Sequence, residues 1–199
     1  MSLIDVCQTV PGGFRDKTGE FYTDKDNSDI CLSYNGQQYT YDNFPAYILK
    51  VVHDDMAENP IAMESLVEDM GLTDLKSQTR QYLACRHGSF DMTPDISEDG
   101  KLTPAEYVNC GRRGQCKAEG KVCPALKVKY GYLNANEIIT LTHIGNGLID
   151  KEIEDVTGFS VHTIRNHKDS TSRKTGLERK PLLCRLAFEL GLVKKLELR

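Results

Sequence analysis

The sequence predicts a mainly α-helical protein with one small β-hairpin, divided into a first domain over residues 1–130 and a second over residues 131–199. Three observations support this prediction. Apolar residues recur at helical spacing over 44–85 and over 134–190, short β-type segments flank Asn35-Gly36, and the hydrophobic periodicity stops between Arg86 and Val128. A chain of 199 residues is long enough for two small domains, each with its own core.

The first 41 residues are expected to form an arm followed by the hairpin. Residues 1–29 are rich in Gly, Asp, Thr and Lys and show no sustained period, so we expect an irregular arm or a loosely packed start and assign no function to it. Residues 30–34 and 37–41 then flank Asn35-Gly36, a dipeptide that adopts positive φ values easily and suits a tight turn. The arm and the hairpin therefore precede the helical part of the first domain.

Three helices are expected after the hairpin. Asn43 can cap a helix over residues 44–58, which carries an apolar stripe. Pro60 can begin a second helix that ends near residue 70, before Gly71. Thr73 can cap a third helix that reaches residue 85. The stretch over 86–128 that follows is rich in Gly, Pro, Asp and Cys, and a segment so long without a core suggests a bound ion.

Composition excludes several protein classes. With 39% hydrophobic and 27% charged residues the chain is typical of globular proteins, and no apolar run approaches the roughly 18 to 20 residues that span a membrane. The start lacks the basic segment and long apolar run of a secretory signal. We therefore expect a soluble, cytoplasmic protein with no membrane partner and with reduced thiols.

Charge is distributed unevenly along the chain. The net charge is −4, but residues 1–109 contain 8 Lys and Arg against 19 Asp and Glu. Residues 110–132 contain 6 basic residues against 1 acidic, and residues 158–186 contain 7 against 2. A polyanion would bind at such basic segments, although basic runs are also common on ordinary solvated surfaces.

Four of the seven cysteines are candidate metal ligands. Cys85, Cys110, Cys116 and Cys123 are separated by 24, 5 and 6 residues, and clustered thiols in a reducing compartment more often hold metal than form disulfides. Four thiolates could complete a tetrahedral zinc site or bind an iron–sulfur cluster. The absence of paired Cys-x2-Cys knuckles slightly favours iron–sulfur over a structural zinc. Nearby positive charge would stabilise either site, and it comes from Arg112, Arg113, Lys117 and Lys121. Ordinary small buried side chains are expected at the remaining positions, Cys7, Cys31 and Cys184.

A calcium loop is a weaker prediction. Residues 95–106 fit the twelve-residue EF-hand template, with a glycine at the sharp turn and oxygen ligands at Asp95, Ser97, Asp99 and Glu106. No convincing helix precedes the loop, and no second hand is present to pair with it. An acidic turn that joins the cysteine-bearing segments is the competing interpretation.

The last third of the chain contains the signals of a helix-turn-helix. Asn134 and Glu137 can form a capping box at the start of a helix that Gly147 ends. A short helix over 150–156 follows, Gly158 can make the tight turn, and Ser160 can cap a third helix over 161–174. A fourth helix is expected near residues 180–190, with leucines at helical spacing.

This segment resembles the LuxR/FixJ-type helix-turn-helix domain of transcriptional regulators. The residues that fall at the spacing of that family are Leu133, Glu137, Leu141, Gly147, Lys151-Glu152-Ile153, Ser160, Thr163-Ile164, His167, Lys174, Gly176, Leu183, Ala187 and Gly191-Leu192. The sequence departs from the family at Thr157 and Thr175, where leucine is usual, so the local packing of the second and third helices is expected to differ.

The resemblance implies a four-helix module that binds double-stranded DNA with its third helix in the major groove. Phosphates would be held by Lys151, Thr163, Lys168, Arg173 and Lys174. The exposed leading half of the helix also includes Val161, and nearest the bases would lie His162, Arg165 and Asn166. The fourth helix would form a homodimer face, and RNA polymerase is a further candidate partner. Such a protein is not an enzyme but a sequence-specific regulator, here with a redox- or metal-sensing cysteine site.

Three alternatives remain at this stage. The helix-turn-helix could be a scaffold that does not bind DNA, since motif matches carry false positives. The chain could be a zinc-stapled adaptor in a nucleoprotein assembly, or an iron–sulfur redox protein with a nucleic-acid-binding tail. A phosphoacceptor receiver domain is disfavoured because the first part lacks a repeated strand–helix pattern.

Overall fold

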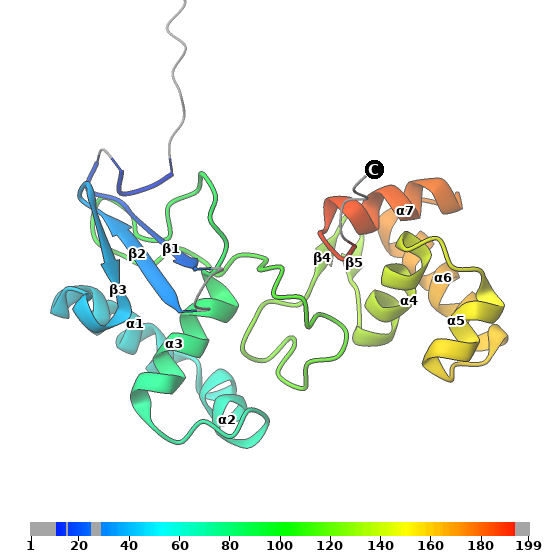
Figure 1. Ribbon diagram of the computed structural model, residues 1–199, viewed down its shortest axis with the longest axis horizontal. Coiled ribbons are helices and arrows are strands. Elements are labelled where there is room, and N and C mark those ends of the chain that lie inside the picture. Colours follow the sequence, from blue (N-terminus) through cyan, green and yellow to red (C-terminus); the bar gives the residue numbers. More distant parts are fainter. Residues whose placement is uncertain (1–10, 15, 25–28, 194–199) are drawn as a thin grey trace, which may run out of the picture. The chain divides into compact units, whose positions relative to one another are not determined.

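The computed structural model describes residues 11–14, 16–24 and 29–193. The chain is mainly helical with a small antiparallel sheet, and it divides into two compact units between Val108 and Asn109 (Figure 1). Residues 109–130, which the sequence prediction placed in the first domain, belong to the second unit. Among the described helices, none has the length and apolar character needed to cross a membrane.

The sheet of the first unit has three antiparallel strands in the order β1 (Gly19–Thr23), β2 (Ile30–Tyr34) and β3 (Gln37–Thr40). The predicted hairpin is confirmed, since β2 and β3 are joined by Asn35 and Gly36 with φ of 51° and 73°. The prediction of an irregular arm up to residue 29 is wrong for β1, which pairs with β2 over its whole length. The five residues of β1 are too few for an alternation of apolar and polar residues to predict a strand. The strand forms because it pairs with β2. Cys7 lies outside the described residues.

Three helices follow the sheet: α1 (Ala46–Glu58), α2 (Pro60–Glu68) and α3 (Leu75–Arg86). Asn43 does not cap α1; it ends a short 3₁₀ helix that starts at Tyr41, and Pro45 holds the N-cap position. A proline disfavours helical dihedrals in the residue before it, and Phe44 is accordingly non-helical. The cap of α3 is Asp74 rather than the predicted residue 73, and its carboxylate accepts from the backbone N–H of Ser77.

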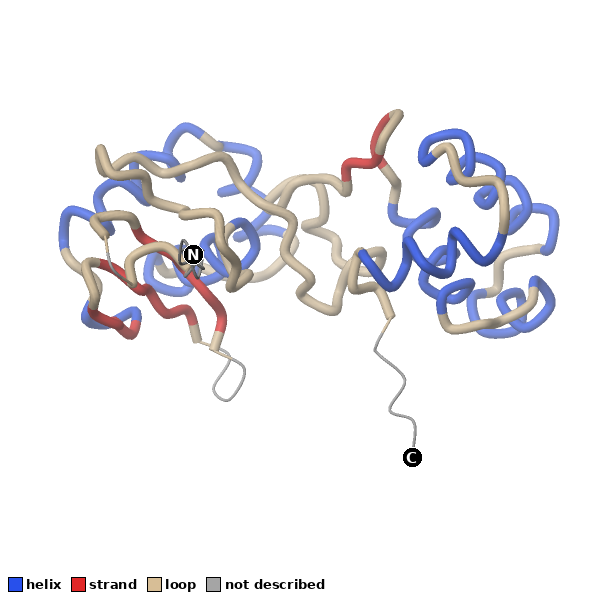
Figure 2. The backbone as a smooth tube through the Cα atoms, turned by 90° about the horizontal axis from the view of Figure 1, so that it is seen from above, coloured by secondary structure: helices blue, strands red, loops and turns tan. Residues whose placement is uncertain are grey.

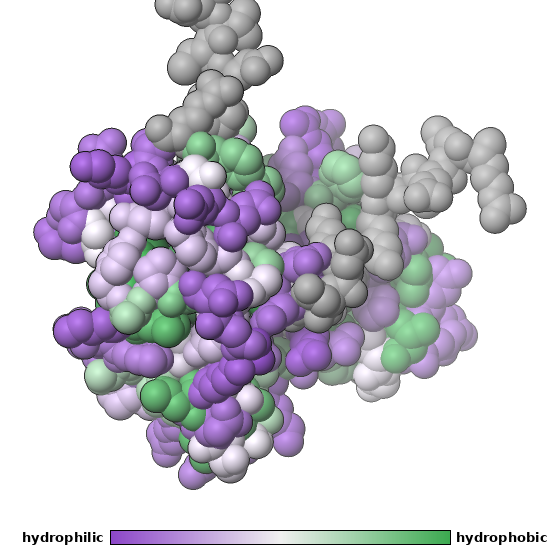
Figure 3. Space-filling view, turned by 60° about the vertical axis from the view of Figure 1, so that its left-hand side comes forward, coloured by the Kyte–Doolittle hydropathy of each residue, from purple (hydrophilic) through white to green (hydrophobic). Residues whose placement is uncertain are grey.

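The core of the first unit lies between the sheet and its helices. Strands β1 and β2 contact α3, and the helices pack on one another in sequence order. The side chains fully excluded from solvent come from both layers, and they include Phe21, Leu32, Ile48, Val52, Leu66 and Leu83. The outer surface of this unit that Figure 3 presents is mainly hydrophilic.

The second unit begins with loops, drawn tan in Figure 2, and continues with a two-stranded hairpin and four helices. The strands are β4 (Lys127–Val128) and β5 (Gly131–Tyr132), and no sequence signal predicted them. The helices are α4 (Ala135–Gly145), α5 (Asp150–Thr157), α6 (Val161–Thr175) and α7 (Lys180–Glu189). Helices were expected over these four segments, and the capping box of Asn134 and Glu137 is present with both of its hydrogen bonds.

Helix α4 forms the centre of the second unit. It packs against α6 and α7, and α5 packs against α6. Gly145 allows the close approach of α7, because a Cβ at this position would lie 2.6 Å from the Cβ of Ala187. The apolar residues at the centre of this packing are Ile138, Leu141, Ile144, Ile153, Ile164 and Leu183, all at most 2% exposed.

Candidate nucleic-acid interface

The connection between α5 and α6 is a tight turn with a defined cap at each side. Gly158 ends α5 in the left-handed conformation, with φ of 73°, which a residue with a Cβ rarely adopts. Two residues later, the hydroxyl of Ser160 accepts from the backbone N–H of Thr163 at 3.1 Å and caps α6. Local sequence signals therefore place the N-terminus of α6 immediately after a sharp turn.

Thr157 and Thr175, the two departures from the LuxR pattern, have the same role at the ends of α5 and α6. Each hydroxyl donates to the carbonyl four residues earlier, at 2.6 Å from Thr157 and 2.8 Å from Thr175. Each also accepts from the N–H two residues later, on Phe159 or Leu177, at 3.2 Å. Because a left-handed glycine follows each threonine, the hydroxyl satisfies backbone groups that the turning helix leaves unpaired.

One face of α6 is open to solvent. Ile164, Thr171 and Thr175 are buried on the opposite face. The exposed residues recur three or four positions apart, and they are His162, Arg165, Asn166, Asp169 and Arg173. Their side chains offer the donors and acceptors that read base edges in a major groove. Sequence analysis missed Asp169, although its spacing from Arg165 and Asn166 placed it on the same face.

Lys168 lies beside this face but is held by an ion pair. Its Nζ is 2.8 Å and 3.2 Å from the two carboxylate oxygens of Asp150, the first residue of α5. The Nε of Arg165 is 3.9 Å from the same carboxylate, while the Arg165 side chain remains 68% exposed. Asp150 therefore connects the start of α5 to α6 and neutralises part of the positive charge predicted to meet phosphate.

Lys174 forms a more complete ion pair than Lys168 does. Its Nζ lies 2.7 Å from both oxygens of Glu137, whose side chain is only 2% exposed, and the hydroxyl of Ser170 donates to the same carboxylate at 2.6 Å. Burial alone would raise the pKa of Glu137, but the hydrogen bonds from Lys174 and Ser170 lower it below its ordinary value. The pair joins α4 to the C-terminal part of α6, so Lys174 has a structural partner in addition to its predicted role.

The remaining predicted DNA-binding residues lie around the start of α6. Lys151 is exposed on α5, whereas Val161 is half-buried in the first turn of α6. Thr163 is also half-buried, and its hydroxyl lies 2.9 Å from that of Ser160. Behind the exposed face, the Nδ1 of His167 lies 3.1 Å from the Thr140 hydroxyl, so this ring belongs to the packing of α6 on α4.

Three of the four predicted metal-ligand cysteines lie in the second unit. Cys110 is exposed, Cys116 is half-buried and Cys123 is buried, and burial raises the pKa of the Cys123 thiol. Cys85 lies in α3 of the first unit, where its Sγ is 3.1 Å from the Nε2 of Gln81. Within the described ranges, no group of three or more His, Cys, Asp or Glu side chains could hold a metal ion. Cys31 is buried and Cys184 is partly exposed.

The loop over residues 95–106 does not have EF-hand geometry. Ser97 and Asp99 hydrogen-bond to each other on an exposed turn, whereas Asp95 is only 3% exposed and bonds to other groups. Its two oxygens are 2.7 Å from the Nδ1 of His87 and 2.8 Å from the N–H of Phe21. No helix follows the loop, where Glu106 accepts from the N–H of Ser89. Among the residues that the structure describes, these side chains do not form a group of three or more acidic ligands that could hold a metal ion.

Acidic groups of this loop are part of a buried cluster in the first unit. Burial raises the pKa of Asp95 and lowers that of His87, so it disfavours the charged form of each member of this hydrogen-bonded pair. Burial also raises the pKa of Glu20 and Glu106 to about 8, and the nearby carboxylate of Asp91 adds to both shifts. The net negative charge of the first unit is thus smaller than its composition suggests.

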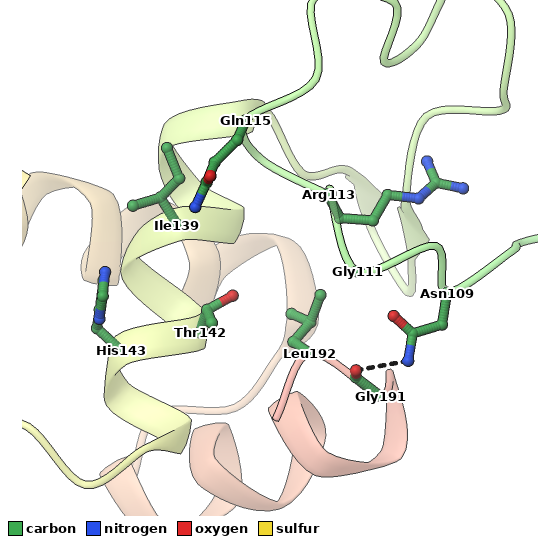
Figure 4. A pocket seen from close by; sticks show the side chains of 9 residues that line it. All are labelled: Asn109, Gly111, Arg113, Gln115, Ile139, Thr142, His143, Gly191 and Leu192. Carbon is green, nitrogen blue, oxygen red and sulfur yellow. Dashed lines mark hydrogen bonds between the residues drawn. The ribbon is translucent and has the colours of Figure 1, made fainter. Parts of the chain in front are cut away.

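A small hollow in the second unit lies between α4 and the loop that carries Cys110 (Figure 4). Its volume is about 110 Å³, well below the roughly 300 Å³ of a typical small-molecule pocket. Asn109 closes one side through a 2.6 Å hydrogen bond to the carbonyl of Gly191. The guanidinium of Arg113 points away from α4 and donates to the carbonyl of Pro124 at 2.8 Å. This hollow does not provide a ligand site of ordinary size.

Comparisons with protein family models, with curated proteins and with solved structures find no match to this chain.

Proposed function

We propose that this protein is a sequence-specific DNA-binding transcriptional regulator of the LuxR type, in which α6 is the recognition helix. The observation that carries the proposal is the exposed face of α6, where His162, Arg165 and Asn166 follow a capped N-terminus and a tight turn. Arginine and asparagine form bidentate pairs with guanine and adenine, respectively, so these two residues would read bases.

Charge supports duplex DNA as the partner of this face. Arg165 and Arg173 are exposed on α6, and Lys151 is exposed on α5. Asp169 is acidic and would repel phosphate, but an aspartate directed into the groove accepts from the amino group of cytosine. The face thus combines phosphate-binding groups at its edges with base-reading groups along its centre, as direct readout requires.

Dimerisation through α7 is part of the proposal. Phe188 is 50% exposed on this helix, and the exposed residues Arg185 and Glu189 lie three residues before it and one after it. In a symmetric dimer the same patch of each copy would meet itself, so Phe188 would contact the Phe188 side chain of the second copy or its neighbours. Two copies would present their recognition helices to half-sites about one helical turn apart, or a multiple of that distance.

The experiment that tests the proposal is selection of duplexes from a randomised pool by the full chain, followed by titration of the selected duplex. Arg165→Ala and Asn166→Ala should each weaken discrimination at one base pair by about 1–3 kcal/mol. Arg185→Ala is the matched control, because it removes the same charge as Arg165→Ala from an exposed side chain of the same unit. Failure to enrich any sequence, or unchanged preference in both α6 variants, would overturn the proposal.

We also propose a redox or metal response through Cys85, Cys110, Cys116 and Cys123, which rests on their sequence pattern alone, because the described side chains do not form a metal-binding group. Anaerobic purification with metal analysis and a visible spectrum would distinguish the two candidate groups. Iron, sulfide and a visible absorption band that are lost in Cys116→Ser would support an iron–sulfur sensor. Stoichiometric zinc without colour would support a structural staple.

A further inference from the structure

The short hairpin that precedes α4 presents a basic and aromatic surface. In this 127–132 hairpin, Lys127 pairs with Tyr132 and Val128 with Gly131, so Lys129 and Tyr130 form the turn. Tyr130 is 62% exposed and Tyr132 is 56% exposed, and both lysines are exposed as well. Two exposed aromatic rings and two exposed lysines on so short a hairpin form a basic and aromatic surface of the kind that meets a polyanion.

The hairpin is rigidly attached at its base. The N–H of Leu133 donates to the carbonyl of Leu126 at 2.9 Å, and the two side chains are 3% and 2% exposed. These buried leucines anchor both ends of the hairpin in the core of the second unit. Its tip therefore has a defined position relative to the helices.

The tip is also joined to the C-terminal end of α6. The N–H of Tyr130 donates to the carbonyl of Lys174 at 2.8 Å, and β5 contacts α6 (Figure 1). Gly176 packs against the Tyr130 ring so closely that a Cβ at that glycine would lie 3.0 Å from the ring. The hydrogen bond satisfies one of the last carbonyls of α6, which would otherwise present negative partial charge at this end.

Positive charge collects at this end of α6. Lys127 and Lys129 make no ion pair with any described residue, and the Nζ of Lys129 lies 4.7 Å from the centre of the Tyr130 ring. Arg173 is exposed on the last turn of α6. Residues 120–136 contain no Asp or Glu, so this surface has no acidic neighbour in sequence. The Lys174 ammonium does not add to it, because Glu137 neutralises that group.

We propose that the 127–132 hairpin is a second DNA-contacting element, in which Lys127 and Lys129 bind backbone phosphates beside the groove that α6 enters. This inference rests on the proposed function. A recognition helix contacts base edges mainly with its N-terminal residues, and the 15 residues of α6 extend for roughly 22 Å beyond its start. When the leading half of α6 lies in the groove, its C-terminal end and the attached hairpin lie at the phosphate wall.

The test compares the salt dependence of binding to the duplex selected by the full wild-type chain. The variant is Lys127→Gln with Lys129→Gln, which keeps much of each side-chain stem and removes both charges. The matched control is Lys50→Gln with Lys101→Gln, which removes two exposed lysine charges from the first unit. Circular dichroism and thermal melting verify that each variant is folded.

Each lost phosphate contact should lower the slope of log affinity against log salt by about 0.9, so the hairpin variant should lose about 1.8. Between 50 and 200 mM salt, the affinity of the wild-type chain should then fall about twelvefold more than that of the variant. The base preference should stay unchanged in the hairpin variant, and the slope should stay unchanged in the control.

An unchanged slope in the hairpin variant, with sequence-specific wild-type binding intact, would overturn this inference and leave the proposed function standing. Equal loss of slope in the control would overturn it too, because general charge would then explain the effect. If the wild-type chain binds single strands more tightly than the selected duplex, and Tyr130→Ala loses this binding, the hairpin stacks on bases with its tyrosines. That result would overturn the proposed phosphate contact. If the wild-type chain selects no duplex, both proposals fail together.

Discussion

Replacement of Glu137 tests whether the buried ion pair with Lys174 holds α6 against α4. Glu137→Ala removes the carboxylate that accepts from Lys174, from Ser170 and from the backbone N–H of Asn134. The ammonium is then left in a half-buried position without its partner, while the capping box at the start of α4 is lost. The second unit should therefore become less stable, and the exposed face of α6 should lose its fixed orientation.

The expected loss in the free energy of unfolding follows from how deeply Glu137 and Lys174 are buried. Removal of one member of a fully buried pair costs about 3–5 kcal/mol, but the Lys174 side chain is 30% exposed and can regain part of its hydration. Loss of the capping interaction adds about 1 kcal/mol. We expect Glu137→Ala to lower the free energy of unfolding of the second unit by about 3 kcal/mol. Adding Lys174→Met should recover about 1–2 kcal/mol, because no unpaired ammonium then remains.

The assay is native-state hydrogen exchange of the full chain, followed on peptides from α4 and α6, because the sequence has no tryptophan to report on one unit. The matched control is Glu152→Ala, which removes an exposed carboxylate that accepts from the N–H of Ile149 at the start of α5. This control should cost only about 0.5–1 kcal/mol.

The pH dependence gives a second readout of the same pair. Because its pKa is lowered in the folded chain, Glu137 contributes stability above its ordinary value of 4.5, and this contribution is lost as the pH falls through the folded pKa. The difference in unfolding free energy between wild type and Glu137→Gln should therefore shrink as the pH falls below 4.5. A cost for Glu137→Ala no larger than that of Glu152→Ala, or a difference that grows on acidification, would refute the reasoning.

Three further predictions concern other parts of the chain. Because burial raises the folded pKa of Glu20 to about 8, its protonated form contributes stability that is fully present below pH 4.5 and is lost as the pH rises to 8. The variant Glu20→Gln should therefore unfold at a higher temperature than wild type at pH 8, and the difference should be smaller at pH 5. Asp150→Asn should free Lys168 and steepen the salt slope of DNA binding by about 0.9, whereas an unchanged slope would show that this ammonium never reaches phosphate. Gly145→Val should force α4 and α7 apart at Ala187 and cost about 1–3 kcal/mol in denaturant titration, and a near-neutral result would contradict the close packing.

Several elements could be predicted because their causes are local. The Asn35-Gly36 turn, the capping box at Asn134 and the Ser160 cap each depend on hydrogen bonds or dihedral preferences within about three residues. The same holds for the order of the helices in the second unit and for the chemical character of the exposed positions on α6. Helical spacing alone separates that exposed face from the buried one at Ile164.

Other features depended on contacts between distant segments and could not be derived from spacing. Strand β1 exists through its pairing with β2, and the 127–132 hairpin is held by Leu126, Leu133 and the end of α6. Sequence analysis assigned Lys168 and Lys174 to phosphate because their residue type and position matched a pattern. Their ion pairs involve residues 18 and 37 positions away, and only folding brings those carboxylates within 2.8 Å.

The sequence by itself thus determined where helices begin and end in the second unit and which residue types α6 exposes, since these properties follow from short-range hydrogen bonding and helical periodicity. The tertiary structure decided which of those charges remain available to a ligand. A cation next to a buried carboxylate is neutralised in place, as Glu137 neutralises Lys174, whereas Arg173 one position earlier stays exposed. That difference depends on the three-dimensional neighbours of each side chain, because electrostatic interaction follows distance in space and not separation along the chain.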